Sequence, residues 1–118
     1  MLNVEVTLPV LDVGAHLDLL CSVVGARPLY AVGDPPAMVG VAFGPWSVGP
    51  CLRLVAAPLP TARVTVTVDV GTEFDSAYRR AVAVGADIAA PPVEQPWGMR
   101  EFVLRLSDGH QLVVTGPA

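Results

Sequence analysis

Residues 96–115 read PWGMREFVLRLSDGHQLVVT, and this stretch decides which fold the chain adopts. A tryptophan held between Pro96 and Gly98 is followed by an alternating apolar segment, a turn at Asp108-Gly109 and a second apolar segment. Alternation with a period of two predicts strands, and a glycine-containing turn between two strands predicts a hairpin. The charged pair Arg100-Glu101 leaves three interpretations open at this point: a catalytic loop, a ligand-binding clamp or the beginning of a strand.

The chain contains an internal repeat with an offset of 60 residues. The segment VEVTLPV at 4–10 aligns without a gap with VTVTVDV at 64–70, and VGA at 24–26 aligns with VGA at 84–86. Each repeat therefore starts with a β-branched strand, and its next segment ends on Gly-Ala, which is typical of a helix that stops at a left-handed residue. The chain is predicted to contain two similar modules.

Between these anchors, each repeat carries apolar residues at helical spacing. Asp12 is the expected N-cap of the first helix, and Thr72 or Asp75 that of the second. Three extended segments follow each helix, so the prediction is β-α-β-β-β, twice. The helical apolar residues are Leu17, Leu20, Cys21 and Val24, then Phe74, Ala77, Tyr78, Ala81 and Val84. The extended segments are 28–32, 37–43 and 51–56, then 87–93, 100–106 and 111–115.

Length and composition fit one domain of 118 residues, with a module at 1–57, a linker at 58–62 and a module at 63–118. The net charge is −4, and seven arginines without a lysine form no basic cluster beyond Arg79-Arg80, which argues against a nucleic-acid partner.

No apolar run approaches the roughly 18 to 20 residues that span a bilayer, and the N-terminus lacks the pattern of an export signal. We therefore expect no membrane partner and a cytoplasmic location. Cys21 and Cys51 are expected to be buried free thiols, with a disulfide as the alternative.

The two modules and the closing stretch resemble the vicinal oxygen chelate superfamily, also called the glyoxalase, bleomycin-resistance and extradiol-dioxygenase fold. Trp97-Gly98, Arg100-Glu101 and Asp108-Gly109-His110 match the end of that family's second module in order and spacing, with Ser107 where the family commonly has proline. The resemblance implies an α+β fold in which two βαβββ modules form curled mixed sheets around a cup, with the helices outside. It also implies a homodimer that shares or completes the cups. Because the family contains both enzymes and pure binders, fold alone does not decide function.

The metal-ligand positions of the family's enzymes fall on Glu5 and Thr65 in the first strands, and near Arg53 and on Val113 in the last strands. Strand alternation agrees, because it turns Val4, Val6 and Leu8 toward the helix and Glu5 and Thr7 toward the cup, with Thr65 and Thr67 equivalent in the second module. One carboxylate, one hydroxyl, one guanidinium and one isopropyl group cannot chelate a divalent ion. We therefore expect no metal and no cofactor.

Other catalytic constellations are missing from the sequence: there is no GxSxG, no phosphate-binding glycine loop and no HExxH. His16, expected on the exposed side of the first helix, and His110, in the last turn, are interpreted as solvated or capping residues. Glu5 and Glu101 are the candidates for a general base. The alternative for both is a solvated carboxylate or one paired with Arg53 or Arg100.

Without a metal, the cup becomes an apolar groove with a few polar groups, as a small-molecule site requires. Both tryptophans follow a proline, which restricts the backbone, and such a ring stacks on a planar ligand for about 0.5 to 1.5 kcal/mol beyond area burial. The alternative is that these rings close the rim of the cup or a dimer interface; Phe74, Tyr78 and Phe102 are expected in the core. The predicted ligand-binding residues are Trp97, Trp46, Met99, Tyr30, Met38, Phe43, Arg53, Glu5, Thr65, Thr67 and Val113.

Metal-free members of the family with aromatic cups resemble drug-sequestering resistance proteins. The favoured hypothesis is therefore a non-catalytic dimeric protein that binds a bulky aromatic cytotoxic natural product, and the modest net charge favours a neutral or quinone-like ligand. The alternatives are a glyoxalase-, lyase- or isomerase-type enzyme that uses Glu5 or Glu101, and an interaction module whose cup is filled by its own side chains.

Overall fold

The computed structural model describes residues 4–44, 49–57, 63–106 and 108–118. The chain divides into two compact units, unit 1 (1–62) and unit 2 (63–118). Unit 1 contains β1 (Val6–Val10), α1 (Val13–Val24), β2 (Arg27–Val32), β3 (Met38–Ala42) and β4 (Leu52–Ala56). Unit 2 contains β5 (Thr65–Asp69), the short 3₁₀ helix η1 (Gly71–Glu73), α2 (Phe74–Ala83), β6 (Asp87–Glu94), β7 (Met99–Arg105) and β8 (Gln111–Pro117).

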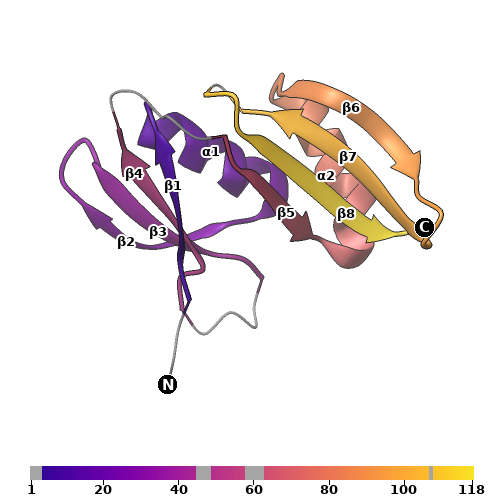
Figure 1. Ribbon diagram of the computed structural model, residues 1–118, viewed down its shortest axis with the longest axis horizontal. Helices are drawn as coiled ribbons and strands as arrows, with labels where there is room; N and C mark the ends of the chain where they lie inside the picture. The colour runs from indigo at the N-terminus through magenta and orange to yellow at the C-terminus, as the bar shows by residue number, and fades with distance from the viewer. Residues whose placement is uncertain (1–3, 45–48, 58–62, 107) are drawn as a thin grey trace. The chain divides into compact units, whose positions relative to one another are not determined.

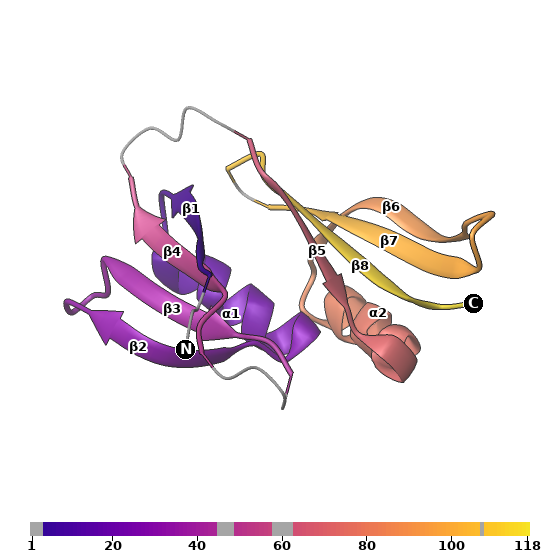
Figure 2. The same ribbon diagram turned by 60° about the horizontal axis from the view of Figure 1, so that its bottom comes forward.

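Both units have the same topology, a four-stranded mixed sheet with one helix on one face (Figures 1 and 2). The strand order is β1-β4-β3-β2 in unit 1 and β5-β8-β7-β6 in unit 2. In each unit the first strand pairs in parallel with the last, and the other pairs are antiparallel. The predicted pair of α+β, βαβββ modules is confirmed.

Helix α1 begins and ends where the sequence predicts, but it buries a different face. The Asp12 carboxylate accepts a hydrogen bond from the Ala15 backbone N–H at 3.0 Å, and Gly25 ends the helix with φ 69°. The buried face includes His16, which is only 3% exposed. The expectation that His16 lies on the exposed side is wrong, because the buried stripe continues from Val13 through His16 to Leu20.

Helix α2 starts differently from the prediction, because η1 precedes it. Neither Thr72 nor Asp75 is the N-cap; Glu73 occupies that position without a side-chain hydrogen bond. Asp69 accepts a hydrogen bond from the Gly71 N–H at 2.9 Å at the start of η1. The helix packs on the sheet through Phe74 and Tyr78, whose rings meet that of Phe102 edge-on at centroid distances of 5.3 and 5.2 Å. Phe74 and Phe102 are buried as predicted, whereas Tyr78 is half-buried.

The stretch 96–115 forms a strand, a turn and a second strand. Trp97 and Gly98 lie in the turn between β6 and β7, where the Gly98 N–H donates to the Gln95 carbonyl at 3.1 Å. Arg100 joins β7 to α2: its guanidinium lies 4.5 Å from the Phe74 ring centroid and 3.0 Å from the Asp75 carboxylate. Arg100 therefore pairs with Asp75 and joins β7 to α2, and the charged pair lies at the beginning of a strand, which is the third of the three interpretations.

His110 in the last turn is fully buried, so its expected solvation is wrong. Its Nδ1 lies 2.9 Å from the backbone N–H of Val64, the residue before β5. A backbone N–H only donates, so His110 accepts this bond and ties the turn before β8 to the start of the neighbouring strand. The capping interpretation of His110 is the one that agrees with the structure.

The expected burial of Val4, Val6 and Leu8 against the helix and of the two cysteines is only partly met. Val4 and Val6 are 77% and 50% exposed, so burial of β1 begins at Leu8. Cys21 and Cys51 are free thiols as expected, but both are half-buried. Burial, followed by the negative charge of Asp18, raises the pKa of Cys21.

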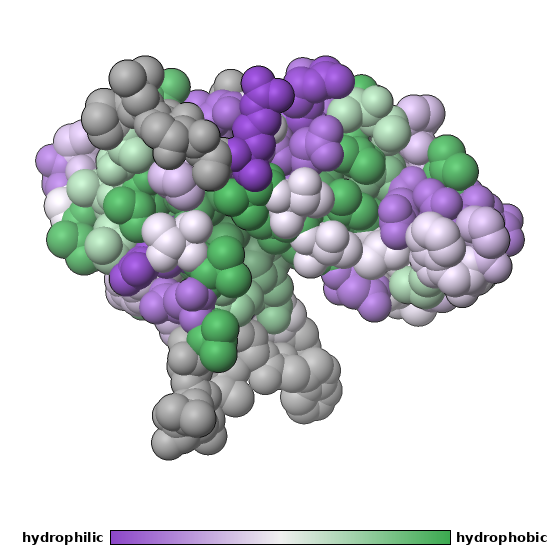
Figure 3. Space-filling view, in the orientation of Figure 1, coloured by the Kyte–Doolittle hydropathy of each residue, from purple (hydrophilic) through white to green (hydrophobic). Residues whose placement is uncertain are grey.

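The face of the molecule that Figure 3 shows mixes hydrophobic and hydrophilic residues. In the part of the chain that the structure describes, no helix is long and apolar enough to cross a membrane.

Candidate ligand-binding site

One cross-strand row of unit 1 brings together residues from all four strands. Thr7 on β1 pairs with Arg53 on β4, Arg53 with Gly40 on β3, and Gly40 with Tyr30 on β2. Residues opposite one another in a sheet project from the same face. The flanking residues Leu8, Leu54 and Val39 are buried in the core, so the row lies on the face opposite α1.

The Tyr30 side chain crosses this face toward Glu5, just before β1. A register shift between Pro28 and Tyr30 marks a bulge in β2, a feature that re-aims side chains. The ring lies against Gly40, where a Cβ atom would overlap the Cε1 and Cζ atoms of Tyr30. The Tyr30 hydroxyl donates a hydrogen bond to Glu5 Oε1 at 2.7 Å. A glycine in the strand interior therefore lets the phenol on edge strand β2 reach the residue that precedes edge strand β1.

Arg53 is held in the same row by Thr7. Its Nε and Nη2 atoms lie 3.2 and 2.8 Å from the Thr7 hydroxyl oxygen, which accepts both hydrogen bonds. The ion pairs of the described residues include Arg100–Asp75 and Arg105–Asp87, and no carboxylate of the described residues is paired with Arg53. The predicted Glu5–Arg53 ion pair is not formed, since Glu5 binds the Tyr30 phenol instead.

The charges of this cluster act on Tyr30. The hydrogen bond to Glu5, followed by desolvation and the negative charge of Glu5, raises the pKa of Tyr30 above its ordinary value. Arg53 acts in the opposite direction, through its positive charge and a hydrogen bond to Tyr30. The phenol therefore stays protonated at neutral pH and keeps Glu5 as its acceptor. We call Glu5, Thr7, Tyr30 and Arg53 the polar cluster.

The equivalent row of unit 2 has no such cluster. Thr67 pairs with Val113, Val113 with Val103, and Val103 with Ala90, so Val113 stands where unit 1 has Arg53. Thr65 and Thr67 are exposed on β5. The predicted residues Thr65, Thr67 and Val113 thus share one sheet face but offer only hydroxyl and aliphatic groups.

The other predicted binding residues lie outside the polar cluster. Met38 is half-buried on β3 and shares the face of Gly40, two residues along the strand, and Phe43 is half-buried just after β3. In unit 2, Met99 begins β7 half-buried, and Trp97 is 66% exposed in the β6–β7 turn. Trp46 lies outside the described residues.

The donor set does not fit a divalent metal. Glu5 is the single carboxylate of the polar cluster, it already accepts the Tyr30 hydrogen bond, and a guanidinium lies in the same row. The corresponding positions of unit 2 carry Thr65 and Val113. Within the described ranges, no three His, Cys, Asp or Glu residues are grouped so as to hold a metal ion.

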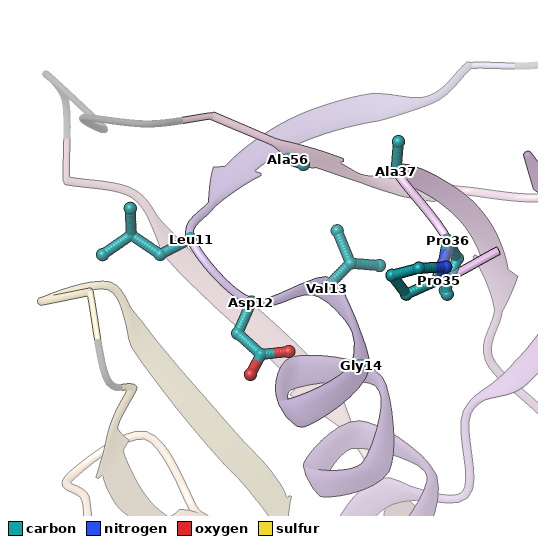
Figure 4. A pocket seen from close by; sticks show the side chains of 8 residues that line it. All are labelled: Leu11, Asp12, Val13, Gly14, Pro35, Pro36, Ala37 and Ala56. Atoms are coloured by element: carbon teal, nitrogen blue, oxygen red, sulfur yellow. The ribbon is translucent and has the colours of Figure 1, made fainter. Parts of the chain in front are cut away.

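A pocket of about 430 Å³ lies elsewhere in unit 1, beside the start of α1 (Figure 4). The Val13 side chain projects toward Pro35 and Ala37, and the one carboxylate, Asp12, is engaged as the helix N-cap. None of the predicted ligand-binding residues lines this pocket. Because the pocket offers an open, mostly aliphatic wall and the sheet face offers directed polar groups, we take the polar cluster as the candidate site. The pocket is lined by Leu11, Asp12, Val13, Gly14, Pro35, Pro36, Ala37 and Ala56.

No protein-family model matches the chain, and no curated protein sequence matches it significantly. Solved structures match over its whole length. TioX from Micromonospora sp. ML1 is 24% identical with a TM-score of 0.79, and the alignment covers 100% of both chains. A glyoxalase/bleomycin resistance protein/dioxygenase from Nocardioides is 22% identical with a TM-score of 0.68, over 97% of this chain and 82% of that one.

The chain has the glyoxalase/bleomycin resistance/dioxygenase fold. The fosfomycin resistance protein FosX from Mesorhizobium loti shares this fold at 18% identity and a TM-score of 0.73, over 100% of this chain and 92% of that one. The fold thus covers proteins named for resistance and proteins named for catalysis, and the resemblance to the vicinal oxygen chelate superfamily is confirmed at the level of fold.

Sequence reasoning missed two members of this arrangement. Gly40 has no functional group that would mark it as a site residue. A glycine in the middle of a predicted strand is nevertheless a known signal that another group approaches the backbone closely. Thr7 is placed on the correct face by alternation, but its role as the acceptor for Arg53 depends on the parallel register of β1 and β4.

Proposed function

We propose that this protein is a non-catalytic binder that sequesters a bulky aromatic natural product, in the manner of antibiotic self-resistance proteins. The observation that carries the proposal is the polar cluster. At the family's metal-ligand positions in unit 1, the chain has a Tyr30–Glu5 hydrogen bond and a guanidinium held by Thr7, and in this proposal these groups orient the ligand.

Aromatic and sulfur-containing side chains supply the contact area in this proposal. Tyr30 and Met38 share the face of the polar cluster, and Trp97 presents a largely exposed ring behind Pro96. A ring on a tight turn loses little freedom on binding, and stacking on a planar ligand adds about 0.5 to 1.5 kcal/mol. Trp46, Phe43 and Met99, with Thr65, Thr67 and Val113, remain the further contacts that we propose.

The proposal is tested by screening planar aromatic natural products for quenching of tryptophan fluorescence and recovering each bound compound by mass spectrometry. We expect saturable quenching, a compound returned unchanged, and weaker binding in Trp97→Ala and Tyr30→Ala. Arg79→Ala, an exposed change on α2, is the control. If no compound in the screen quenches saturably, sequestration is wrong.

An enzyme of the same fold is the second candidate. The specific observation in its favour is the Glu5–Tyr30 pair, since a carboxylate hydrogen-bonded to a phenol is an acid–base pair. Glu101 on β7 is the other candidate base. Recovery of a chemically altered compound, lost in Glu5→Gln or in Glu101→Gln, favours this reading over sequestration.

Homodimerisation and a cytoplasmic location are also part of the proposal. Sedimentation equilibrium of the purified protein tests the dimer, because a second copy that completes the binding surface doubles the measured mass.

A further inference from the structure

We propose that the ligand of unit 1 carries a carboxylate or an equivalent oxyanion, and that Arg53 and Thr7 together bind it. The inference rests on the proposed small-molecule function and goes further by naming the group that the site recognises. It departs from the neutral ligand favoured by the overall charge of −4, because local donors at a site decide recognition more strongly than net charge.

The first step of the argument is the count of unused donors. A guanidinium has five N–H groups, and two of those on Arg53 bond to Thr7; even if a third is directed at the Tyr30 oxygen, two are left. At least two N–H groups remain, and no described carboxylate pairs with them. Arg53 is half-buried, so a charge with free donors is presented at the surface of the sheet.

The second step concerns the Thr7 hydroxyl. Its oxygen accepts two N–H bonds from Arg53, which uses both lone pairs and leaves its own hydrogen to donate. Within the described part of the chain, the hydrogen bonds of this hydroxyl are the two from Arg53. The two side chains are register partners on adjacent strands, so their donors are neighbours on one face. A carboxylate has two oxygens, one for each partner.

The third step is that the other polar groups do not compete for this role. The Tyr30 hydroxyl donates its hydrogen to Glu5, and the Glu5 carboxylate only accepts, so neither residue offers a donor to a ligand oxygen. Glu5 is a like charge two residues along the chain from Thr7, and a repulsion of this kind at a charge separation of about 7 Å in water weakens anion binding by about threefold. Unit 2 provides an internal comparison, because Thr67 there pairs with Val113 and no guanidinium is present.

The test uses two probes of the same shape, 2-naphthoate and the uncharged 2-naphthamide, with affinities measured by titration calorimetry. We expect naphthoate to bind about tenfold more tightly than naphthamide, since a charge-assisted hydrogen bond is lost in the amide. Arg53→Gln is expected to abolish this preference and Thr7→Val to reduce it. Glu5→Gln is expected to strengthen naphthoate binding about threefold.

Matched controls separate this site from general electrostatics. Arg105→Gln removes one positive charge from an exposed ion pair in unit 2, and Arg79→Gln removes an exposed positive charge on α2; both are expected to keep the tenfold preference. Circular dichroism verifies that each variant is folded. Equal affinity for the two probes, no binding of naphthoate, or a preference that survives in Arg53→Gln overturns the inference. Binding of uncharged aromatic compounds in the screen would leave sequestration standing in each of these cases.

Discussion

Tyr30 and Gly40 are register partners on β2 and β3, and the phenol ring occupies the space that a side chain at position 40 would need. This relationship places the hydroxyl of Tyr30 on Glu5, at the opposite edge of the sheet. The site of unit 1 therefore depends on a glycine that makes no polar contact with a ligand.

Replacing Gly40 by alanine is expected to displace the Tyr30 ring and to cost about 1 to 3 kcal/mol of unfolding free energy through overpacking. Gly14→Ala is the matched control, because its new methyl group meets only Asp12 Oδ1 at 3.5 Å and helix propensity makes the change neutral or stabilising by up to about 1 kcal/mol. Urea denaturation measures both. In a Tyr30→Ala background the cost of Gly40→Ala should largely disappear; an unchanged cost would show that the two residues are not coupled.

Tyr30→Phe is expected to lower stability at neutral pH but not at high pH. The pKa of Tyr30 is raised in the folded protein, so its hydroxyl stabilises the fold below the ordinary value of 10.0 and loses this effect as the pH rises through the folded-state pKa. The difference in urea midpoint between wild type and Tyr30→Phe should therefore shrink from about pH 8 to about pH 11. Glu5→Gln, which removes the main cause of the shift, should weaken this pH dependence. A midpoint difference that is constant with pH contradicts the assignment.

The two histidine rings are expected to differ in which nitrogen carries the N–H, Nδ1 in His16 and Nε2 in His110. His16 Nδ1 lies 2.8 Å from the Asp12 carbonyl oxygen, which only accepts, so this ring carries Nδ1–H. His110 Nδ1 accepts from Val64, so its ring carries Nε2–H. Long-range ¹H–¹⁵N spectra of the imidazoles distinguish the two forms. The same tautomer in both rings would exclude one of these hydrogen bonds.

Loss of the His110 side chain is expected to destabilise unit 2. His110→Ala leaves the Val64 N–H without its buried acceptor and creates a cavity, at a cost of about 2 kcal/mol or more. His110→Asn offers a side-chain oxygen near the same place and should recover part of this loss. Denaturation midpoints of the two variants provide the measurement, and equal losses would mean that packing, not the hydrogen bond, dominates.

Arg100→Gln is expected to cost about 1 kcal/mol, because the guanidinium lies over the Phe74 ring and pairs with Asp75 while it is only 32% exposed. Arg105→Gln breaks an ion pair whose partners are both more than half exposed and should cost less than about 0.5 kcal/mol. Thermal or chemical unfolding of the two variants checks the difference. Equal effects would argue against the contribution of the ring contact.

The sequence by itself determined the architecture of this protein. The 60-residue repeat and the period-two alternation predict both βαβββ modules, and Gly25 and Gly85 mark the helix ends, since each has a left-handed backbone with φ 69° and 70°. These features are local, so they can be read along the chain. The stretch 96–115 belongs to this class, because its turn glycines and alternating residues specify a hairpin.

Only the tertiary structure decided which polar residues meet. Glu5, Tyr30 and Arg53 were each predicted to contact the ligand. The hydrogen bonds that they form within the protein depend on strand register, on the bulge before Tyr30 and on the lack of a side chain at Gly40. His16 was misplaced for a similar reason: the buried face of α1 is set by the sheet it packs against, and a one-residue rotation of the helix exchanges His16 for Leu17. Period and turn chemistry are properties of neighbouring residues, whereas a side-chain cluster forms from four strands that only folding brings into register.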